Sequence, residues 1–343
     1  MSLTVIASER FAEHQTPPGH PESPERADVM DVVANDWRSR RGEVVAPREV
    51  TREQLARVHD TAYLDRIAAT AGRAVALDPD TYTSPESAEI ARLSAGAAIQ
   101  AVERVMDGAG RRALALVRPP GHHAERDRAM GFCIYNNVAA ASAHARTLGA
   151  GRVAIVDYDV HHGNGTQHIF ERRSDILYVS THQYPFYPGT GAATEVGEAE
   201  GRGFTVNLPM EAGATGDDYR MTFEEVILPV LRQFAPDLIL ISAGFDAHER
   251  DPLGGMRLTT DAFSSMTTAL RQVADECCGG RIVAVTEGGY DFRALRESLL
   301  AVVETLAPDT SPPLHWPTVR VASTRGSVSV RAAKAALGDS WKF

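Results

Sequence analysis

From about residue 86 onward, short apolar runs alternate with longer stretches that are rich in alanine. The apolar runs are nearly continuous and often β-branched, which is typical of strands buried on both faces. They predict strands at Ala113–Val117, Val153–Val156, Ile176–Ser180, Phe204–Leu208, Leu238–Ser242 and Ile282–Thr286. The longer stretches predict helices at Glu86–Met106, Asn136–Leu148, Tyr219–Phe234, Thr260–Glu276 and Phe292–Leu306. This alternation indicates an α/β fold with a parallel sheet covered by helices on both faces.

The two ends of the chain lack this rhythm. The first 80 residues are polar, irregular and rich in proline, and they predict helical pieces only at about Glu25–Arg38 and Arg52–Ala71. After the composition shift at Pro308–Pro313, the pattern predicts an extended arm or a short helix around Val330–Leu337. With no repeat and no second core, we expect one catalytic domain at 1–307 and a tail at 308–343 that packs on it or extends from it.

Composition excludes several classes of protein. The 343 residues, 43% of them hydrophobic and 23% charged, suit one large soluble domain. A net charge of −10 argues against nucleic acid as a partner. Cys133, Cys277 and Cys278 have neither disulfide-framework nor zinc-finger spacing. No signal peptide and no run of about 18 apolar residues is found, so we expect a cytoplasmic protein without a membrane partner. A homo-oligomer stays open.

Polar residues directly follow four of the predicted strands. His122 and His123 follow the first strand, Asp157 to Asn164 the second, and Asp246 and Tyr290 two later ones. In an open parallel sheet, ligands bind at the carboxyl ends of the strands. We therefore expect these groups to meet at one edge of the sheet.

Asp159, His161 and Asp246 are candidate metal ligands. In extended backbone, Asp159 and His161 point the same way, and Asp246 reaches them from another strand end. Three protein ligands with one open position are typical of catalytic zinc, although Fe(II) or Co(II) would also suit two carboxylates and an imidazole. A lone Asp-x-His more often holds a helix-capping aspartate and a packed histidine. The added Asp246 favours the metal site.

His122 and His123 are candidate proton carriers. Imidazole titrates near neutrality, so it can take a proton from water and return it to an amine. Pro119 and Pro120 restrict the backbone before them. Asp157 and Asn164 are natural partners for the far ring nitrogens of the two histidines.

Three aromatic residues are weaker candidates. Tyr290 follows two glycines, and its phenol could donate to a developing oxyanion or simply pack under a turn. Phe132 and Tyr187 could wall a narrow channel for an aliphatic stem, although core packing is the ordinary role of either one alone.

Five motifs resemble the histone deacetylase superfamily, which includes class II histone deacetylases, bacterial deacetylase-like amidohydrolases, acetylpolyamine amidohydrolases and acetoin-utilisation proteins. They are RPPGHHA (Arg118–Ala124), DYDVHHGNGTQ (Asp157–Gln167), HQYPFYPGTG (His182–Gly191), SAGFDAHERDPLGG (Ser242–Gly255) and EGGYD (Glu287–Asp291). The segment His20–Arg26 is similar to the N-terminal HPExPxR element of that family. The resemblance covers about residues 5–306.

The resemblance implies a single-domain arginase-like fold with a mostly parallel sheet of about eight strands. It implies one zinc ion held by the equivalents of Asp159, His161 and Asp246, and a deacetylase that hydrolyses a linear N-acetyl amide. His123 would be the general base and acid, and Tyr290 would polarise the acetyl carbonyl. His122, paired with Asp157, would give electrostatic support. Asn164 stands where class I relatives carry aspartate, as in class II members.

The family also implies structural potassium and a substrate channel. One potassium site would use Asp157, Asp159, His161, Ser180 and Thr181, and a second would lie around Phe170, Arg173 and Ile176. The channel would be formed by Gly131, Phe132, Tyr187 and Leu253, with Tyr187 in place of the usual phenylalanine.

The substrate expected from the resemblance is acetyl-lysine or a similar acetylated amine. Polyamine-selective relatives carry a glutamate at the position of Leu253. Lysine-directed members have leucine there, as this chain does. The alternatives are an acetylpolyamine or other small N-acyl amine amidohydrolase, a non-catalytic acyl-lysine-binding protein and an arginase-like binuclear manganese enzyme. The last needs more aspartate ligands than these strand ends provide.

Overall fold

The computed structural model describes residues 3–317 and 323–343. Within these residues an eight-stranded sheet has the order β2-β1-β5-β10-β9-β6-β7-β8, and every pairing in it is parallel. Its strands are β1 (Leu3–Ile6), β2 (Glu43–Val45), β5 (Arg112–Ala115), β6 (Val153–Asp157), β7 (Ile176–Gln183), β8 (Thr205–Met210), β9 (Leu238–Ala243) and β10 (Ile282–Thr286). A small antiparallel ribbon pairs β3 (Val75–Ala76) with β4 (Tyr82–Thr83).

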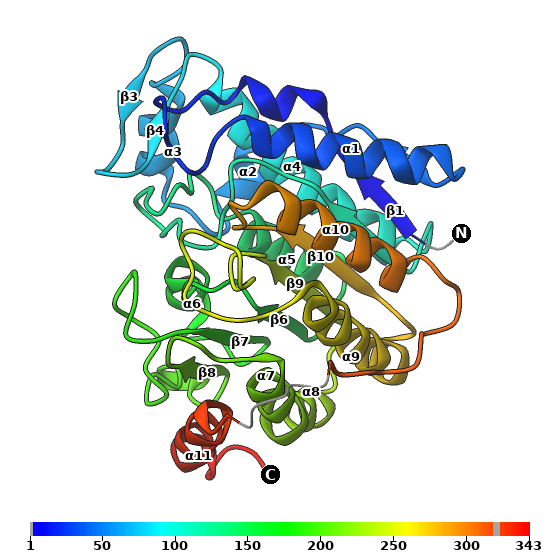
Figure 1. The fold of residues 1–343 in the computed structure, drawn as a ribbon. Coiled ribbons are helices and arrows are strands. Elements are labelled where there is room, and N and C mark those ends of the chain that lie inside the picture. Colours follow the sequence, from blue (N-terminus) through cyan, green and yellow to red (C-terminus); the bar gives the residue numbers. More distant parts are fainter. Residues whose placement is uncertain (1–2, 318–322) are drawn as a thin grey trace.

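Helices cover both faces of the sheet (Figure 1). One face is covered mainly by α1 (Glu25–Ser39), α7 (Gly216–Thr222), α8 (Leu228–Phe234), α9 (Thr260–Cys278) and α10 (Phe292–Leu306). The other is covered mainly by α2 (Arg52–Leu55), α3 (Thr61–Ala68), α4 (Ser87–Met106), α5 (Asn137–Thr147) and α6 (Asn164–Phe170). The α/β sandwich predicted from the alternating pattern is therefore confirmed.

The central strands show why their sequences are almost wholly apolar. Successive side chains of a strand point to opposite faces of the sheet. In β10, Ile282 and Ala284 join the apolar layer under α9 and α10, whereas Val283 and Val285 join the layer under α4 and α5. Both faces of the strand thus lie in a hydrophobic core, so polar and apolar residues do not alternate along it.

Strand β10 joins two halves of the sheet that are otherwise separate. It pairs with β5 on one side and with β9 on the other. The four strands that precede the candidate site residues, β5, β10, β9 and β6, are consecutive neighbours in the sheet. The loops that follow them therefore begin side by side.

The six predicted strands are present, with ends shifted by a few residues. The pattern indicates no strand in the first 80 residues, but they contribute β1, the edge strand β2 and β3, which are too short to show a clear pattern. The single helix predicted at Arg52–Ala71 is also wrong, because the chain breaks into α2 and α3 around Asp60. The helix predicted at Tyr219–Phe234 is interrupted by a π-helical turn, Phe223–Ile227.

The tail forms a longer helix than the pattern predicts. Helix α11 (Arg325–Leu337) lies beyond β8 at one end of the sheet and packs on β8 and α7 (Figure 1). Val330, Ala333 and Leu337 are buried in the same apolar layer as α7 and α8. The division of the chain at residue 307 stays a prediction.

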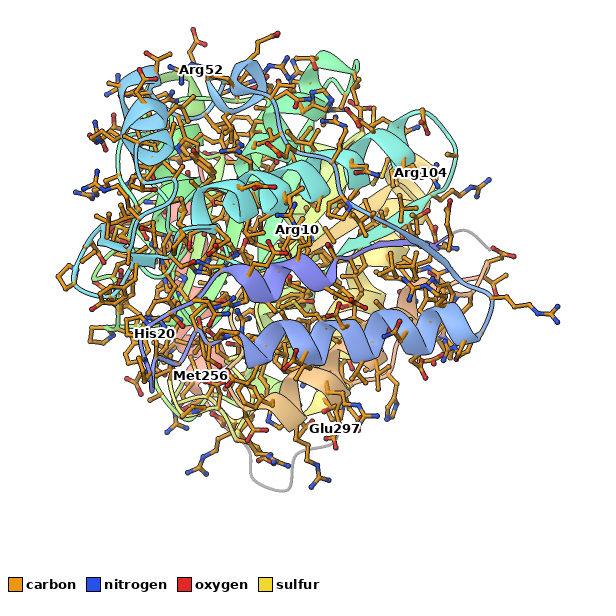
Figure 2. The ribbon with its side chains drawn as sticks, turned by 90° about the horizontal axis from the view of Figure 1, so that it is seen from above. Arg10, His20, Arg52, Arg104, Met256 and Glu297 are labelled. Atoms are coloured by element: carbon orange, nitrogen blue, oxygen red, sulfur yellow. The ribbon has the colours of Figure 1, made fainter. Side chains whose placement is uncertain are left out.

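The N-terminal segment crosses the outside of the molecule. The 3₁₀ helix η1 (Glu9–Glu13) and α1 lie side by side, as the view from above shows (Figure 2). Arg10 lies between η1 and α4, with ion pairs of 2.8 Å to Glu13 and 2.7 Å to Glu89. In the part of the chain that the structure describes, no helix combines the length and the apolar character that crossing a bilayer requires.

His59 joins the α2–α3 segment to the start of α5. Its Nε2 accepts from the Asn136 backbone N–H at 2.9 Å, and its Nδ1 donates to the Glu125 carbonyl oxygen at 2.9 Å. The ring is buried, and burial lowers the pKa of His59 to about 4. The folded protein therefore holds this imidazole neutral.

We expect His59 to make the fold sensitive to acid. The unfolded chain protonates this residue near its ordinary pKa of about 6.5, so between about pH 6.5 and 4 the unfolded state binds more protons and the free energy of unfolding falls as the pH drops. Between pH 7 and 5, the wild type should lose about 2 kcal/mol more than His59→Gln in urea denaturation. Equal losses in the two proteins would contradict the assignment.

Candidate active site

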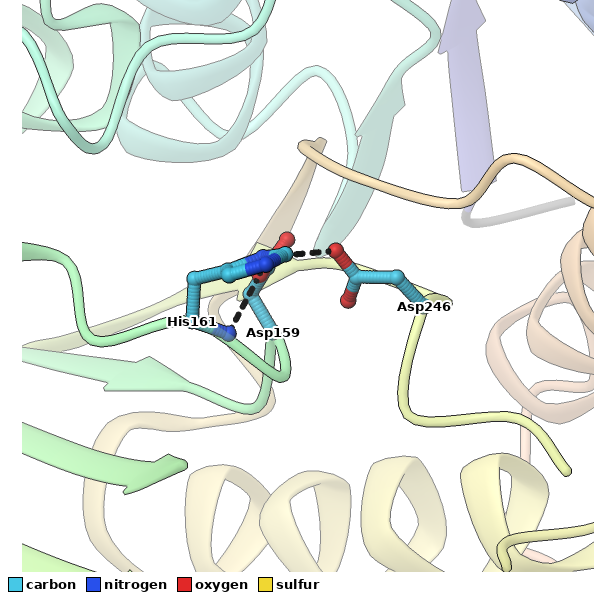
Figure 3. Close-up of side chains that lie close together, drawn as sticks. All are labelled: Asp159, His161 and Asp246. Atoms are coloured by element: carbon cyan, nitrogen blue, oxygen red, sulfur yellow. Dashed lines mark hydrogen bonds and ion pairs between the residues drawn. The ribbon is translucent and has the colours of Figure 1, made fainter. Parts of the chain in front are cut away.

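Asp159, His161 and Asp246 converge at the carboxyl end of the sheet (Figure 3). Each offers one ligand atom, and the three atoms all lie within 4.8 Å of one another. The Nδ1 atom of His161 lies 3.2 Å from Asp159 Oδ1 and 3.1 Å from Asp246 Oδ2. Two residues that are close in sequence and one that is distant thus come together as a group that could hold a metal ion.

Backbone groups hold the two carboxylates in place. Asp159 Oδ1 accepts from the His161 N–H at 2.9 Å, and Asp246 Oδ1 accepts from the Val160 N–H at 2.9 Å. Asp159 Oδ2 accepts from the Gly288 N–H at 2.8 Å. A Cβ atom on Gly288 would overlap both carboxylates, so this close approach requires glycine.

The charges of the three residues favour a cation between them. Burial, and then the charge of Asp159, raise the pKa of Asp246 to about 7. Burial opposes protonation of His161, but its bonds to Asp159 and Asp246 outweigh burial and raise the pKa of His161 to about 10. Two buried carboxylates thus lie next to the same nitrogen of His161, and their combined negative charge favours a cation between them. The donor set fits a divalent metal ion.

The tandem histidines lie beside this triad with different partners. His122 Nδ1 donates to Asp157 Oδ2 at 3.0 Å, and His123 Nδ1 lies 2.7 Å from Asn164 Oδ1. Burial opposes the charge on His122, but Asp157 outweighs it and raises the pKa of His122 to about 10. Burial, and then the charge of His122, lower the pKa of His123 well below its ordinary value. One imidazole is therefore cationic and its neighbour neutral.

A cavity of about 220 Å³ opens above these rings. It is lined by Asp80, Pro120, His122, His123, Gly131, Phe132, His161, Phe186, Tyr187, Leu253, Gly288 and Tyr290. Tyr187 meets the His123 ring edge-on, with centroids 5.2 Å apart, and Phe132 meets Tyr290 in the same way at 5.8 Å. All four predicted channel residues therefore border the same space as the histidines and Tyr290.

The turn that carries Tyr290 is tied down on two sides. Asp251 Oδ2 accepts from the Tyr290 N–H at 2.7 Å, and Arg26 Nε donates to the Gly289 carbonyl oxygen at 2.8 Å. The Arg26 guanidinium also lies over the Tyr290 ring, 5.1 Å from its centroid. Buried Glu22 pairs with Arg26 at 2.9 Å and with Arg118 at 2.7 Å, which links the N-terminal segment to the histidine loop.

A family model described as the histone deacetylase domain matches residues 20–306. This chain belongs to the histone deacetylase family.

Among its relatives, histone deacetylase 15 of Arabidopsis thaliana is 41% identical over 91% of this chain and 57% of that protein. A histone deacetylase-like amidohydrolase of Pseudomonas aeruginosa is 42% identical, covering 84% of this chain and 77% of its own length. Human polyamine deacetylase HDAC10 is 40% identical, and the matched region covers 87% of this chain and 46% of that protein. The chain thus spans only about half the length of two of these relatives.

The comparison with solved structures agrees with the comparison of sequences. The crystal structure of the HDA15 HD domain matches with a TM-score of 0.91 and 38% identity, covering 99% of this chain and 95% of that one. The deacetylase-like fold expected from the motifs is therefore confirmed.

Sequence reasoning missed several residues of this candidate site. Asp80 and Phe186 line the cavity, and Phe186 stacks on His161 with centroids 5.3 Å apart. Glu287 Oε2 accepts from the N–H groups of Gly121, at 2.6 Å, and His122, at 3.1 Å. The motif EGGYD contains Glu287, but no spacing rule connects it to the histidine loop. Only the pairing of β10 with β5 brings them together.

The residues predicted to hold potassium lie in two places. Asp157 faces Ser180 in the register of β6 and β7, and Thr181 Oγ1 donates to the Asp157 carbonyl oxygen at 3.5 Å. In the second group, the Arg173 N–H donates to the Phe170 carbonyl oxygen at 2.8 Å, and Ile176 begins β7. Potassium binding at either place stays a prediction.

The close approach at Gly288 gives a test of the metal site. We expect Gly288→Ala to displace both carboxylates and to weaken zinc binding by about 10-fold or more, as changes next to metal ligands do. Affinity is measured by competition with a chelating dye. Gly338→Ala, at the end of α11, is the matched control and should bind zinc like the wild type. Unchanged affinity in Gly288→Ala would show that the ion binds elsewhere.

Proposed function

We propose that this chain is a zinc-dependent deacetylase that hydrolyses an N-acetyl amide to an amine and acetate. The observation that carries the proposal is the triad of Asp159, His161 and Asp246, whose His161 lines the same cavity as the histidine pair and Tyr290. The family also contains relatives named as deacetylases and amidohydrolases.

Asp159, His161 and Asp246 would hold the zinc ion, and two carboxylates with one imidazole fit its preference for oxygen and nitrogen ligands. Bound there, zinc would supply Lewis acidity, which lowers the pKa of a water molecule and polarises a carbonyl oxygen. Fe(II) or Co(II) would suit the same ligands.

His123 is the group that moves protons in this proposal. An amide oxygen can only accept, so the proton of His123 lies on Nδ1, which donates to Asn164 Oδ1. The Nε2 lone pair is then free to take a proton from the attacking water and to return it to the departing amine. The low pKa of His123 keeps this nitrogen unprotonated before the reaction starts.

His122 and Tyr290 would stabilise the charges that develop during the reaction. His122, held cationic by Asp157, places positive charge beside the ring that receives the proton, with centroids 4.0 Å apart. Tyr290 stays protonated because burial raises the pKa of its phenol well above the ordinary value. Its O–H can therefore donate to the oxygen of the tetrahedral intermediate.

The cavity selects the substrate. Phe132 and Tyr187 give it aromatic walls, which suit the aliphatic stem of an acetylated lysine, and Leu253 adds an apolar contact. An acetylated polyamine is the second candidate, because Asp80 places a carboxylate in the same lining and two relatives are named polyamine deacetylases. Acetyl-lysine fits better, since Leu253 leaves a free ammonium without a partner at that position.

Tyr290→Phe should lower kcat about 10²- to 10³-fold, because it removes one donor to the developing oxyanion. The measurement is turnover of an acetyl-lysine reporter by zinc-loaded protein. Zinc content and melting temperature should match the wild type, since the ring and its turn are kept. Wild-type turnover in this variant would exclude the phenol from the reaction.

Leu253→Glu should shift the preference toward polyamines. A carboxylate in the cavity lining attracts the free ammonium of acetylputrescine, and a partly exposed ion pair changes affinity by about 2- to 5-fold. The ratio of kcat/KM for acetylputrescine to that for an acetyl-lysine peptide should rise accordingly. Leu253→Gln is the uncharged control of the same shape and should leave the ratio unchanged. An equal rise in both variants would argue against a charge effect.

A further inference from the structure

A chain of hydrogen bonds runs from His123 to the surface of the protein. Asn164 Oδ1 lies 2.7 Å from His123 Nδ1, and Asn164 Nδ2 donates to Glu125 Oε1 at 2.6 Å. His168 Nδ1 donates to the same Glu125 oxygen at 2.8 Å. His123, Asn164 and Glu125 are buried, whereas 37% of the His168 side chain is exposed.

Helix α6 builds this chain of contacts. Asn164 opens the helix and His168 lies four residues later, so the two side chains lie on one helical face. Glu125 comes from the loop that follows the histidine pair and accepts from both of them. A single carboxylate therefore ties the histidine loop to α6.

The amide group of Asn164 has almost the same shape in two orientations, which differ by a half-turn that exchanges its oxygen and its NH₂ group. A flip would place NH₂ donors against His123 Nδ1. The imidazole would then have to carry its proton on Nε2, the nitrogen that must stay free to accept one. The tautomer of His123 thus depends on which way the Asn164 amide points.

Glu125 decides this orientation. An ionised carboxylate can only accept, so it binds the NH₂ end of Asn164 and leaves the oxygen for His123. The other acceptors near Asn164 Nδ2 are more distant: the His123 carbonyl oxygen at 3.5 Å and Met130 Sδ at 3.4 Å. Burial raises the pKa of Glu125, but the bond from His168 and its charge outweigh burial and keep the carboxyl ionised.

We propose that Glu125, held by His168, is a positioning residue that orients the Asn164 amide and thereby keeps the His123 proton on Nδ1. The inference deepens the proposed function, because it rests on His123 acting as the base. Glu125 touches neither the triad nor the cavity, and it acts through Asn164 alone.

A double-mutant cycle tests the proposal by turnover of an acetyl-lysine reporter. Glu125→Ala should lower kcat by about 10- to 100-fold, the usual effect of losing such a partner, with KM little changed. In the Asn164→Asp background both side-chain oxygens accept, so the tautomer no longer depends on orientation. There, Glu125→Ala also removes a like charge and should leave kcat unchanged or raise it.

Equal losses in the two backgrounds would mean that Glu125 serves only the fold and would overturn the proposal. If Glu125→Ala does not fold, the isosteric Glu125→Gln replaces it in both backgrounds, with a smaller fall expected beside Asn164 and none beside the aspartate. Glu103→Ala is the matched control, because Glu103 forms another glutamate–histidine pair, 2.9 Å from His144, far from the cavity. It should keep wild-type kcat.

A second measurement does not depend on activity. Long-range ¹⁵N–¹H spectra of histidine-labelled, zinc-loaded protein report which ring nitrogen carries the proton, and a His123→Gln spectrum assigns the signals. We expect His123 Nδ1 to be protonated in the wild type and to lose that proton in Glu125→Ala. If this shift occurs in a protein that cleaves no acetyl amide, the proposed function fails and the positioning stands. Active protein with identical spectra would refute the positioning.

Discussion

The buried negative charge at the carboxyl end of the sheet is the constraint around which this site is built. Asp157, Asp159 and Asp246 are fully buried, and an unbalanced charge in such a place costs several kcal/mol. Residues from several segments compensate this charge. His122 and the Tyr178 hydroxyl bond to Asp157, and His161 bridges the other two carboxylates. Even the glycines contribute, since they allow backbone N–H groups to come close enough to donate.

This balance also explains why neighbouring histidines behave differently. His122 faces a carboxylate and is cationic, whereas His123 faces a neutral amide and stays neutral. The rings are chemically identical, and their backbones are adjacent. Their partners flank one loop: Asp157 ends β6, and Asn164 begins α6 seven positions later. Which of the two imidazoles carries a charge is thus decided by the residues at the two ends of this loop as much as by the histidines themselves.

The sequence predicts those parts of the fold that are long and wholly buried. Strands such as β9 and β10 are continuous apolar runs, and their positions were predicted to within a residue or two. Strands β1 and β2 were not predicted because they have only four and three residues. Pairing with β5 makes β1 a strand, and pairing with β1 makes β2 one. Helix α6 was not predicted for a similar reason, since it has only seven residues and its polar first turn resembles a loop in sequence.

In the site, too, residues that are close in sequence could be predicted, whereas partners from distant segments could not. Asp159 and His161 are two residues apart, so their geometry can be predicted from the strand that precedes them. The parallel sheet then adds Asp246 by topology. Glu125, Glu287 and Arg26 could not be predicted, because each acts through hydrogen bonds to backbone or side chains from other segments. Such partners cannot be predicted from the spacing or the type of residues in the sequence.

The place of β10 in the sheet has a consequence for how the protein matures on the ribosome. The strands of the halves β2-β1-β5 and β9-β6-β7-β8 are joined only by β10, which is the last strand of the sheet along the chain. That strand also leads into Glu287, Gly288 and Tyr290. Before β10 has been synthesised, the edges of β5 and β9 that face each other have no strand between them to pair with. The strand that completes the sheet is therefore also the one that brings in Tyr290, the last of the candidate site residues along the chain.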